Sequence, residues 1–275
     1  MGEPVIKLIL SDIDGTILPY GHKHVSAPLL DAIHEALDAG IRFGPCTGRG
    51  MEWLPPLFCD DAAAYATAIA TNGQSVYLDG QALVEAHFTP EQLKPLIEEL
   101  SDVAGAGVLV FIDGVPHLLC GEPSDLLASY AEYAKSAIIE KTIPDSDAIT
   151  KCNVFLRGDM DATVELCNRL NERIDALDFD IPSPAFLNVM LKGRNKASGI
   201  DMLTTHLGIT LEDVVVFGDG GNDVPMLAHV PNSVAVAQAM PQATAAARWH
   251  TGSVDEDAVA DDIRALARGE WPFTH

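Results

Sequence analysis

Basic residues are scarce in this sequence. Its 275 residues include 17 Lys and Arg against 40 Asp and Glu, which gives a formal net charge of −23 at pH 7. A nucleic-acid-binding surface needs a basic footprint, and docking on anionic membranes needs clustered cations, so this balance argues against both kinds of partner. The negative net charge of the protein would repel a phosphorylated substrate electrostatically. A phosphate site here would therefore need local cations or a metal ion.

Cysteines and long apolar runs are also few. The cysteine number is odd and no C-x-x-C pair occurs, which favours reduced structural thiols over a disulfide framework or a zinc ribbon. No stretch is apolar enough to cross a bilayer, and the first residues do not resemble a signal peptide. We therefore expect a cytoplasmic protein. The apolar fraction of 48% is ample for one large α/β core or two unequal domains, although aromatic residues make up only 6%.

Two carboxylates, Asp12 and Asp14, follow an apolar run at residues 5–10 that predicts a buried parallel strand. Open α/β sheets bind ligands where such strands end. One carboxylate can attack phosphorus, a second can handle the leaving-group proton, and both can hold Mg²⁺. Gly15 lets the chain turn sharply after them. The same residues are also typical of a surface Asx turn, so this motif alone leaves both interpretations open.

Other strand and helix ends carry polar groups in the same way. A predicted strand at 41–45 leads into Cys46-Thr47-Gly48-Arg49, and another at 65–70 ends in Thr71-Asn72-Gly73. Lys196 stands at the start of a predicted helix, and a buried strand at 214–217 ends in Gly218-Asp219-Gly220-Gly221-Asn222-Asp223. Each could be a plain turn or a solvated lysine. Their order and their placement at element ends favour one shared site.

The middle of the chain has a different pattern. From about residue 82, hairpin strands around Asp113-Gly114 alternate with amphipathic helices, which predicts an antiparallel α+β domain. Pro182-Ser183-Pro184 is typical of a linker that returns to the first domain. We therefore predict a core domain of residues 1–81 plus 186–275, and an inserted domain of residues 82–185.

Four of these motifs, in this order, resemble the haloacid dehalogenase-like hydrolase superfamily, and within it the Cof-type phosphatases. They are Asp12-Ile13-Asp14-Gly15-Thr16, Thr47-Gly48-Arg49, Lys196 and the acidic loop from Gly218 to Asp223. The first and last are specific, whereas the middle two are weak alone. The resemblance implies an α/β fold, with a Rossmann-like parallel-sheet core and an inserted α+β cap of type IIB that selects the substrate.

The resemblance also implies catalytic roles. Asp12 would be the nucleophile that forms an aspartyl-phosphate, and Asp14 would protonate the leaving oxygen and then activate water. Mg²⁺ would be held by Asp12, Asp219 and the main-chain carbonyl of Asp14, with Asp223 holding the ion or its waters.

Phosphate-binding groups follow from the same resemblance. Lys196 would neutralise phosphate oxygens and Thr47 would hydrogen-bond one of them, joined by the backbone N–H of Gly48. Asn222 would orient Lys196 or the phosphate. Arg49 and Asn72 match positions that lie beside the cap in such enzymes.

Three departures from the family pattern make the substrate harder to transfer. They are Val236-Ala237-Gln238-Ala239, Asp257-Ala258-Val259-Ala260, and Asn188 in place of an acidic residue. The leading hypothesis is a Mg²⁺-dependent phosphomonoesterase acting on a small phosphorylated metabolite such as a sugar phosphate. A phosphomutase with the same covalent intermediate and a non-catalytic sensor of a phosphorylated ligand remain alternatives. The sequence predicts neither the substrate nor whether the protein is a monomer or a homo-oligomer.

Overall fold

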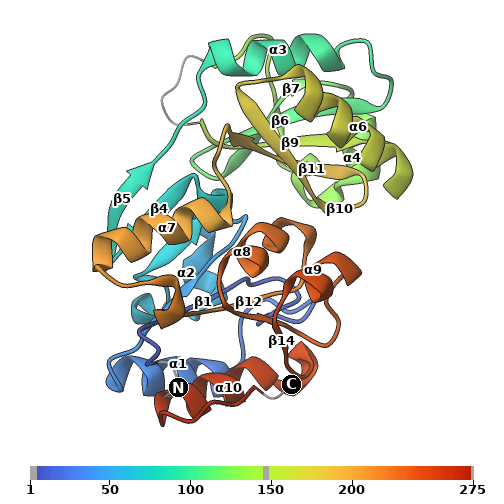
Figure 1. Cartoon of the computed structure of the whole chain (residues 1–275). Helices are drawn as coiled ribbons and strands as arrows, with labels where there is room; N and C mark the ends of the chain where they lie inside the picture. The colour runs from blue at the N-terminus through green and yellow to red at the C-terminus, as the bar shows by residue number, and fades with distance from the viewer. Residues whose placement is uncertain (1–4, 145–148, 274–275) are drawn as a thin grey trace. The chain divides into compact units, whose positions relative to one another are not determined.

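The computed structural model describes residues 5–144 and 149–273. The chain divides into two compact units, and Figure 1 labels most of their helices and strands. The first unit combines Met1–Val84 with Asn195–His275, whereas the second is the continuous stretch Glu85–Arg194. The chain thus inserts one whole unit between two parts of the other.

A five-stranded sheet forms the centre of the first unit. Its described strands lie in the order β14-β13-β12-β1-β2, and every neighbouring pair is parallel. Parallel neighbours need crossover connections, which the helices supply. The strands are β1 (Leu8–Ser11), β2 (Arg42–Pro45), β12 (Val214–Gly218), β13 (Asn232–Ala235) and β14 (Trp249–His250). This confirms the predicted α/β core.

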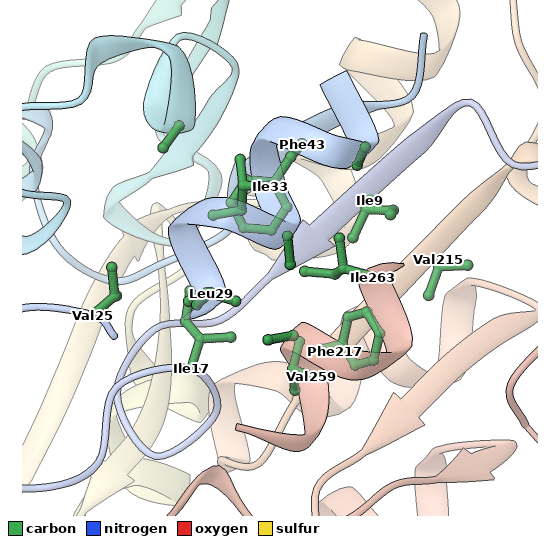
Figure 2. Close-up of a cluster of buried hydrophobic side chains, with 14 of the residues drawn as sticks. Ile9, Ile17, Val25, Leu29, Ile33, Phe43, Val215, Phe217, Val259 and Ile263 are labelled. Atoms are coloured by element: carbon green, nitrogen blue, oxygen red, sulfur yellow. The ribbon is translucent and has the colours of Figure 1, made fainter. Parts of the chain in front are cut away.

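Side-chain alternation along β1 and β12 builds an apolar core on each face of this sheet. On one face, Ile9 and Phe217 pack against α1 (Ala27–Asp38) and α10 (Ala258–Ala267), as Figure 2 shows. On the other face, Leu8 and Val216 pack with residues of α7 (Lys196–Leu207) and α8 (Val224–His229). Helices therefore lie on both faces of the sheet, and polar groups are left to the strand ends.

The smaller elements of the first unit follow the predicted turn and cap chemistry. Ser26 caps α1 by accepting a hydrogen bond from the Leu29 N–H at 3.1 Å. Asp79 and Gly80 both have positive φ, as a type I′ hairpin turn requires, and they join β4 to β5. The remaining helices and strands are α2 (Leu54–Leu57), β3 (Ala68–Ala70), β4 (Ser75–Leu78), β5 (Gln81–Glu85) and α9 (Pro241–Ala246).

The second unit contains a six-stranded sheet of order β10-β11-β9-β6-β7-β8. Residues of α3 and α6 share one buried apolar cluster with this sheet. All its described neighbours are antiparallel except β7 and β8. Its elements are α3 (Pro90–Leu100), β6 (Ala106–Ile112), β7 (Val115–Cys120), α4 (Pro123–Ser129), α5 (Ala131–Ala134), β8 (Ile138–Ile139), β9 (Ile149–Leu156), α6 (Met160–Arg173), β10 (Leu177–Ser183) and β11 (Phe186–Leu191).

The predicted return to the first domain at residue 186 was wrong. Residues 186–191 form β11, which pairs with β9 and β10 of the second unit, and that unit ends at Arg194. Pro182 lies in β10 and Pro184 lies in the turn between β10 and β11, so neither belongs to a linker. Proline is tolerated in β10 because this strand lies at the edge of the sheet and need not donate every backbone N–H.

The helices of both units are short. The longest described helix, α6, has 14 residues. Within the described ranges, none combines the length and the apolar character that spanning a bilayer requires.

Candidate active site

Three buried carboxylates meet at the carboxyl ends of β1 and β12. Asp12 directly follows β1, and its N–H donates to the Phe217 carbonyl of β12 at 2.9 Å. Asp219 directly follows β12, and Asp223 lies four residues further on. One oxygen atom from each of these three acids lies within 4.8 Å of the others. The sequence-predicted acids Asp12, Asp219 and Asp223 therefore form one group, called the acidic group below.

Lys196 lies in the middle of the acidic group. Its side chain is 0% exposed, and its Nζ atom donates to Asp12 Oδ1 and to Asp223 Oδ1, each at 2.6 Å. Charge-assisted hydrogen bonds of this length are strong. A buried ammonium between two carboxylates satisfies charges that would otherwise be very costly to bury.

The start of α7 fixes the position of Lys196. Asn195 caps this helix by accepting from the Ser198 N–H at 2.9 Å, while the Ser198 hydroxyl accepts from the Asn195 N–H at 3.0 Å. Gly73 lies against this cap with φ +88°, and a Cβ atom at position 73 would be 2.0 Å from the Asn195 carbonyl oxygen. The turn after β3 and the start of α7 are therefore in backbone contact.

The remaining atoms of the acidic group are held by hydrogen bonds. Asp223 Oδ2 accepts from the backbone N–H groups of Asp219 and Gly220 at 2.9 and 2.8 Å. The Thr16 hydroxyl donates to Asp219 Oδ1 at 2.7 Å. A Cβ atom on Gly218 would lie 2.7 Å from Asp223, so only glycine fits there. The carboxylates are thus oriented before any ligand binds.

Burial and mutual repulsion raise the pKa values of Asp12 and Asp219. Burial raises the pKa of Asp12 well above its usual range, with Lys196 opposing the shift and Asp223 adding to it. Burial and then Asp223 raise the pKa of Asp219 to about 6, against the lowering effects of Thr16 and Lys196. Burial opposes the charge on Lys196, but Asp12 and Asp223 outweigh it and raise the Lys196 pKa.

The acidic group suits a hard divalent cation. Three carboxylates face one ammonium, which leaves an excess of negative charge in a buried place. Carboxylate oxygens are the ligands that Mg²⁺ prefers, and a second cation would offset the repulsion that raises the Asp12 and Asp219 pKa values. The predicted contact from the Asp14 main-chain carbonyl stays a prediction.

Asp14 lies beside the acidic group but has a separate partner. Its two carboxylate oxygens accept from Arg49 Nε and from an Arg49 terminal nitrogen, each at 2.7 Å. This fork-to-fork geometry fixes the orientation of both groups. The two side chains are 41% and 33% exposed, so this pair is partly solvated. The ion pair joins the loop after β1 to the loop after β2.

The predicted phosphate-binding residues line the adjacent strand ends. The Thr47 N–H donates to the Ile69 carbonyl at 2.8 Å, and the Thr47 carbonyl accepts from the Asn72 N–H at 2.9 Å. Asn222 Nδ2 donates to Asn72 Oδ1 at 3.1 Å. A Cβ atom on Gly48 would lie 3.1 Å from the Asn72 amide. The structure therefore brings together all three loops that carry these residues.

Three residues near this site were not assigned a role from sequence. Thr16 belongs to the first motif, and its bond to Asp219 could have been suspected from that. Gln238 was noted only as a departure from the family pattern, yet its Nε2 atom donates to the Gly15 carbonyl at 3.2 Å. Tyr20 carries no motif signal, and its hydroxyl lies against Gly15 and near Asp219. Burial, then Asp219 and Asp12, raise the pKa of Tyr20 to about 12.

Known proteins share this sequence pattern and fold. A family model described as haloacid dehalogenase-like hydrolase matches residues 9–263. The chain is 24% identical to the 5-amino-6-(5-phospho-D-ribitylamino)uracil phosphatase YbjI of Escherichia coli (strain K12), over 98% of each chain. It is 28% identical to the HMP-PP phosphatase of Klebsiella pneumoniae (strain 342), over 86% of each chain.

One similar solved structure is the HAD subclass IIB sugar phosphatase BT4131. The TM-score is 0.77 at 23% identity, covering 94% of this chain and 98% of that one. At this identity the likeness shows the fold alone, including a cap in the second unit. The resemblance to Cof-type phosphatases found in the motifs is confirmed by the family match and the curated relatives together. The family model covers nearly the whole chain, and this protein belongs to the haloacid dehalogenase-like hydrolase family.

Proposed function

We propose that this protein is a Mg²⁺-dependent phosphomonoesterase that acts on a small phosphorylated metabolite through an aspartyl-phosphate on Asp12. One observation carries the proposal: fully buried Lys196 contacts Asp12 Oδ1 and Asp223 Oδ1 at 2.6 Å each, inside a group of three acids. Such a site combines a nucleophile, Asp12, with a fixed cation, Lys196, and with oxygen ligands for a metal cation. A protein that only binds phosphate has no need of a carboxylate nucleophile.

The metal ion has a defined place in this proposal. Asp12, Asp219 and Asp223, with the main-chain carbonyl of Asp14, would hold Mg²⁺, which supplies charge neutralisation between the attacking carboxylate and the phosphate dianion. Lys196 adds a positive charge that is built into the chain. Its ammonium lies 2.6 Å from Asp12 Oδ1 and can contact a phosphoryl oxygen as the Asp12–phosphorus bond forms.

In the first chemical step, an Asp12 carboxylate oxygen attacks phosphorus and the bond from phosphorus to the ester oxygen breaks. Asp14 donates its proton to that oxygen, so an alcohol leaves. Asp14 is held by Arg49 at 2.7 Å, so it must separate from Arg49 to carry a proton. The Thr47 hydroxyl, the Gly48 N–H and Asn222, which follow strand ends, would hold the phosphoryl oxygens.

In the second step, water attacks phosphorus and the bond from phosphorus to Asp12 breaks. Asp14 takes a proton from that water, which regenerates the acid form and releases inorganic phosphate. Asp12 returns to its carboxylate form. The same two residues therefore serve both steps, with Asp14 alternating between acid and base.

We propose that the second unit, residues 85–194, selects the substrate. Two relatives with 24% and 28% identity are named for different phosphorylated compounds, and a structural neighbour is named a sugar phosphatase. The chain therefore supports a class of substrate, a phosphate monoester of a small metabolite such as a sugar phosphate, rather than one compound.

The test is phosphate release from a panel of sugar phosphates, nucleotides and the ribitylaminouracil phosphate named above. Reactions with Mg²⁺ are compared with reactions in EDTA. We expect Mg²⁺-dependent release that is lost in Asp12→Asn, which keeps the shape of the side chain but removes the nucleophile. Asp60→Asn is the matched control, because Asp60 is exposed and its backbone, with φ 63°, suits asparagine equally well.

The alternatives give different results in the same assay. Conversion of a sugar phosphate into an isomer without release of phosphate would favour a phosphomutase. Binding of a phosphorylated ligand with Mg²⁺, but without turnover of any compound, would favour a sensor. Release that continues in EDTA, or in Asp12→Asn, would contradict the proposed mechanism.

A further inference from the structure

A tight turn places Tyr20 next to the acidic group. The His22 N–H donates to the Pro19 carbonyl at 3.1 Å, which closes a four-residue turn with Tyr20 and Gly21 at its centre. Gly21 has φ +87°, as the third position of a type II turn requires. The Tyr20 backbone is therefore fixed by a hydrogen-bonded turn eight residues after the nucleophile.

The Tyr20 hydroxyl points toward the reaction centre. A Cβ atom built on Gly15 would lie 2.9 Å from this hydroxyl and 2.5 Å from Asp219 Oδ2. The two oxygen atoms thus lie over the same face of Gly15. The carboxylates that act on the Tyr20 hydroxyl are, in order of effect, Asp219, Asp12, Asp14 and Asp223. The hydroxyl is near every acid of the proposed site.

The Tyr20 ring, in contrast, lies in solvent. The residue is 76% exposed, which is unusual for an aromatic side chain whose polar end is turned inward. A tyrosine at a protein surface normally packs its ring against apolar side chains and leaves its hydroxyl in water. This inverted arrangement contributes little apolar burial, so packing of the described residues does not explain it. It leaves a flat apolar face open beside the place where a phosphate ester would bind.

We propose that Tyr20 determines specificity for the leaving group of the phosphate ester. The hydroxyl lies at the edge of the acidic group, and the ring forms a flat wall for the part of the substrate bonded to the ester oxygen. Within the proposed class of small phosphorylated metabolites, the site would then favour those whose leaving group carries a planar ring over simple sugar phosphates, because aromatic faces stack on one another. The inference rests on the proposed function, since it takes the phosphate to bind at Asp12.

The test measures binding rather than turnover. In the Asp12→Asn protein with Mg²⁺, the dissociation constants of p-nitrophenyl phosphate and methyl phosphate are measured by calorimetry. These ligands share the phosphate and differ in the leaving group. We expect Tyr20→Ala to weaken the aryl ester by about five- to tenfold, the amount typical of a lost aromatic contact. Binding of methyl phosphate should change by less than about twofold, because the phosphate contacts remain.

Two further variants separate the ring from the hydroxyl and from the loop. Tyr20→Phe keeps the ring, so the preference for the aryl ester should largely persist. His22→Ala is the matched control, because His22 is exposed in the same turn. It should leave both dissociation constants unchanged.

Each contrary outcome has a distinct meaning. Equal weakening of both esters in Tyr20→Ala would overturn the inference and place the residue at the phosphate. An unchanged aryl dissociation constant would also overturn it. If neither ester binds to the Asp12→Asn protein or to the parent chain, and the parent chain releases no phosphate from any compound of the panel, the proposed function fails and the inference fails with it. Phosphate release by the parent chain with no change of preference in Tyr20→Ala would remove the inference alone.

Discussion

Two charge pairs in the same site differ in their contact with water. Lys196 is fully buried between Asp12 and Asp223, whereas the Asp14 and Arg49 side chains are 41% and 33% exposed. The hydrogen bonds in the two places have similar lengths, 2.6 and 2.7 Å. The length of a contact therefore does not indicate what it contributes. Burial decides that, because a partly hydrated ion pair is screened and contributes little to stability.

The difference matches the chemistry proposed for each pair. Lys196 stays charged throughout the proposed reaction and transfers no proton, so its side chain does not need contact with water. Asp14 must give and take a proton in every cycle, so it has to be able to leave Arg49 and contact the ester oxygen or water. A partly exposed pair can separate at low cost. The site thus keeps its permanent charge inside and its mobile proton at the surface.

The largest effect is expected from Lys196→Met, which removes the buried cation between Asp12 and Asp223. Two buried carboxylates lose their cation, so the free energy of unfolding should fall by about 3–5 kcal/mol and phosphate release should disappear. Urea unfolding and the release assay measure the two effects.

Lys7→Met is the matched control for that substitution. Lys7 pairs with Asp213 at 3.2 Å on the surface of the same unit, with its own side chain 51% exposed. The control should change stability by less than about 1 kcal/mol. Similar losses in both variants would mean that burial does not distinguish the two kinds of pair.

A further carboxylate, outside the site, is buried with no cation beside it in the described part of the chain. Asp262 on α10 is 9% exposed, and its Oδ2 atom has no hydrogen-bond partner among the residues described. Burial, opposed by a hydrogen bond from Thr251, raises the pKa of Asp262 to about 6. The folded state therefore binds a proton that the unfolded chain, with its lower pKa, has released. The stability contributed by this proton is complete below about pH 4 and is lost as the pH rises through 6.

Asp262→Asn should remove this pH dependence. The amide is close in shape to the protonated acid and does not ionise, so the variant should become more stable than the parent by about 1–3 kcal/mol at pH 7.5. The two proteins should be similar near pH 4. Urea unfolding at both pH values measures the difference. A stability difference that is the same at both pH values would show that Asp262 does not titrate in this range.

The smallest change in stability is expected from Arg49→Ala, which breaks the exposed pair. The free energy of unfolding should change by less than about 1 kcal/mol. The ratio kcat/KM should fall by about tenfold, because Asp14 loses its orientation and the phosphate loses a nearby cation. Asp14→Asn, which removes the proton donor itself, should lower kcat by about 10²–10⁴. An Arg49→Ala loss as large as that of Asp14→Asn would mean that Arg49 does more than orient Asp14.

The sequence predicted the parallel unit better than the inserted one. The signals for Asp12, Thr47, Lys196 and Asp219 are local, because each follows or begins an element whose apolar pattern is clear. In the second unit, the local pattern at Pro182 and Pro184 predicts a linker, because it does not reveal that β10 is an edge strand.

The contacts within the site could not be predicted from local sequence patterns. Arg49 holds Asp14 across 35 residues, and Asn222 meets Asn72 across 150. Thr16 reaches Asp219 across 203 residues. Such pairings depend on the register of distant strands and on loop geometry, and neither is encoded in a short motif. Tyr20 is a further case, because no motif indicates that its hydroxyl lies against Gly15.

The order of strands in the sheet has a consequence for biosynthesis. β1 pairs with β12, so the strand that carries Asp12 gains this neighbour only after about 200 further residues have been made. The second unit, in contrast, is complete in sequence by Arg194. A nascent chain can therefore finish its inserted unit while β1 still has an open edge, which is a form of exposure that favours aggregation. The residues after 194 close that edge and, in the same event, bring Lys196 and Asp219 to Asp12.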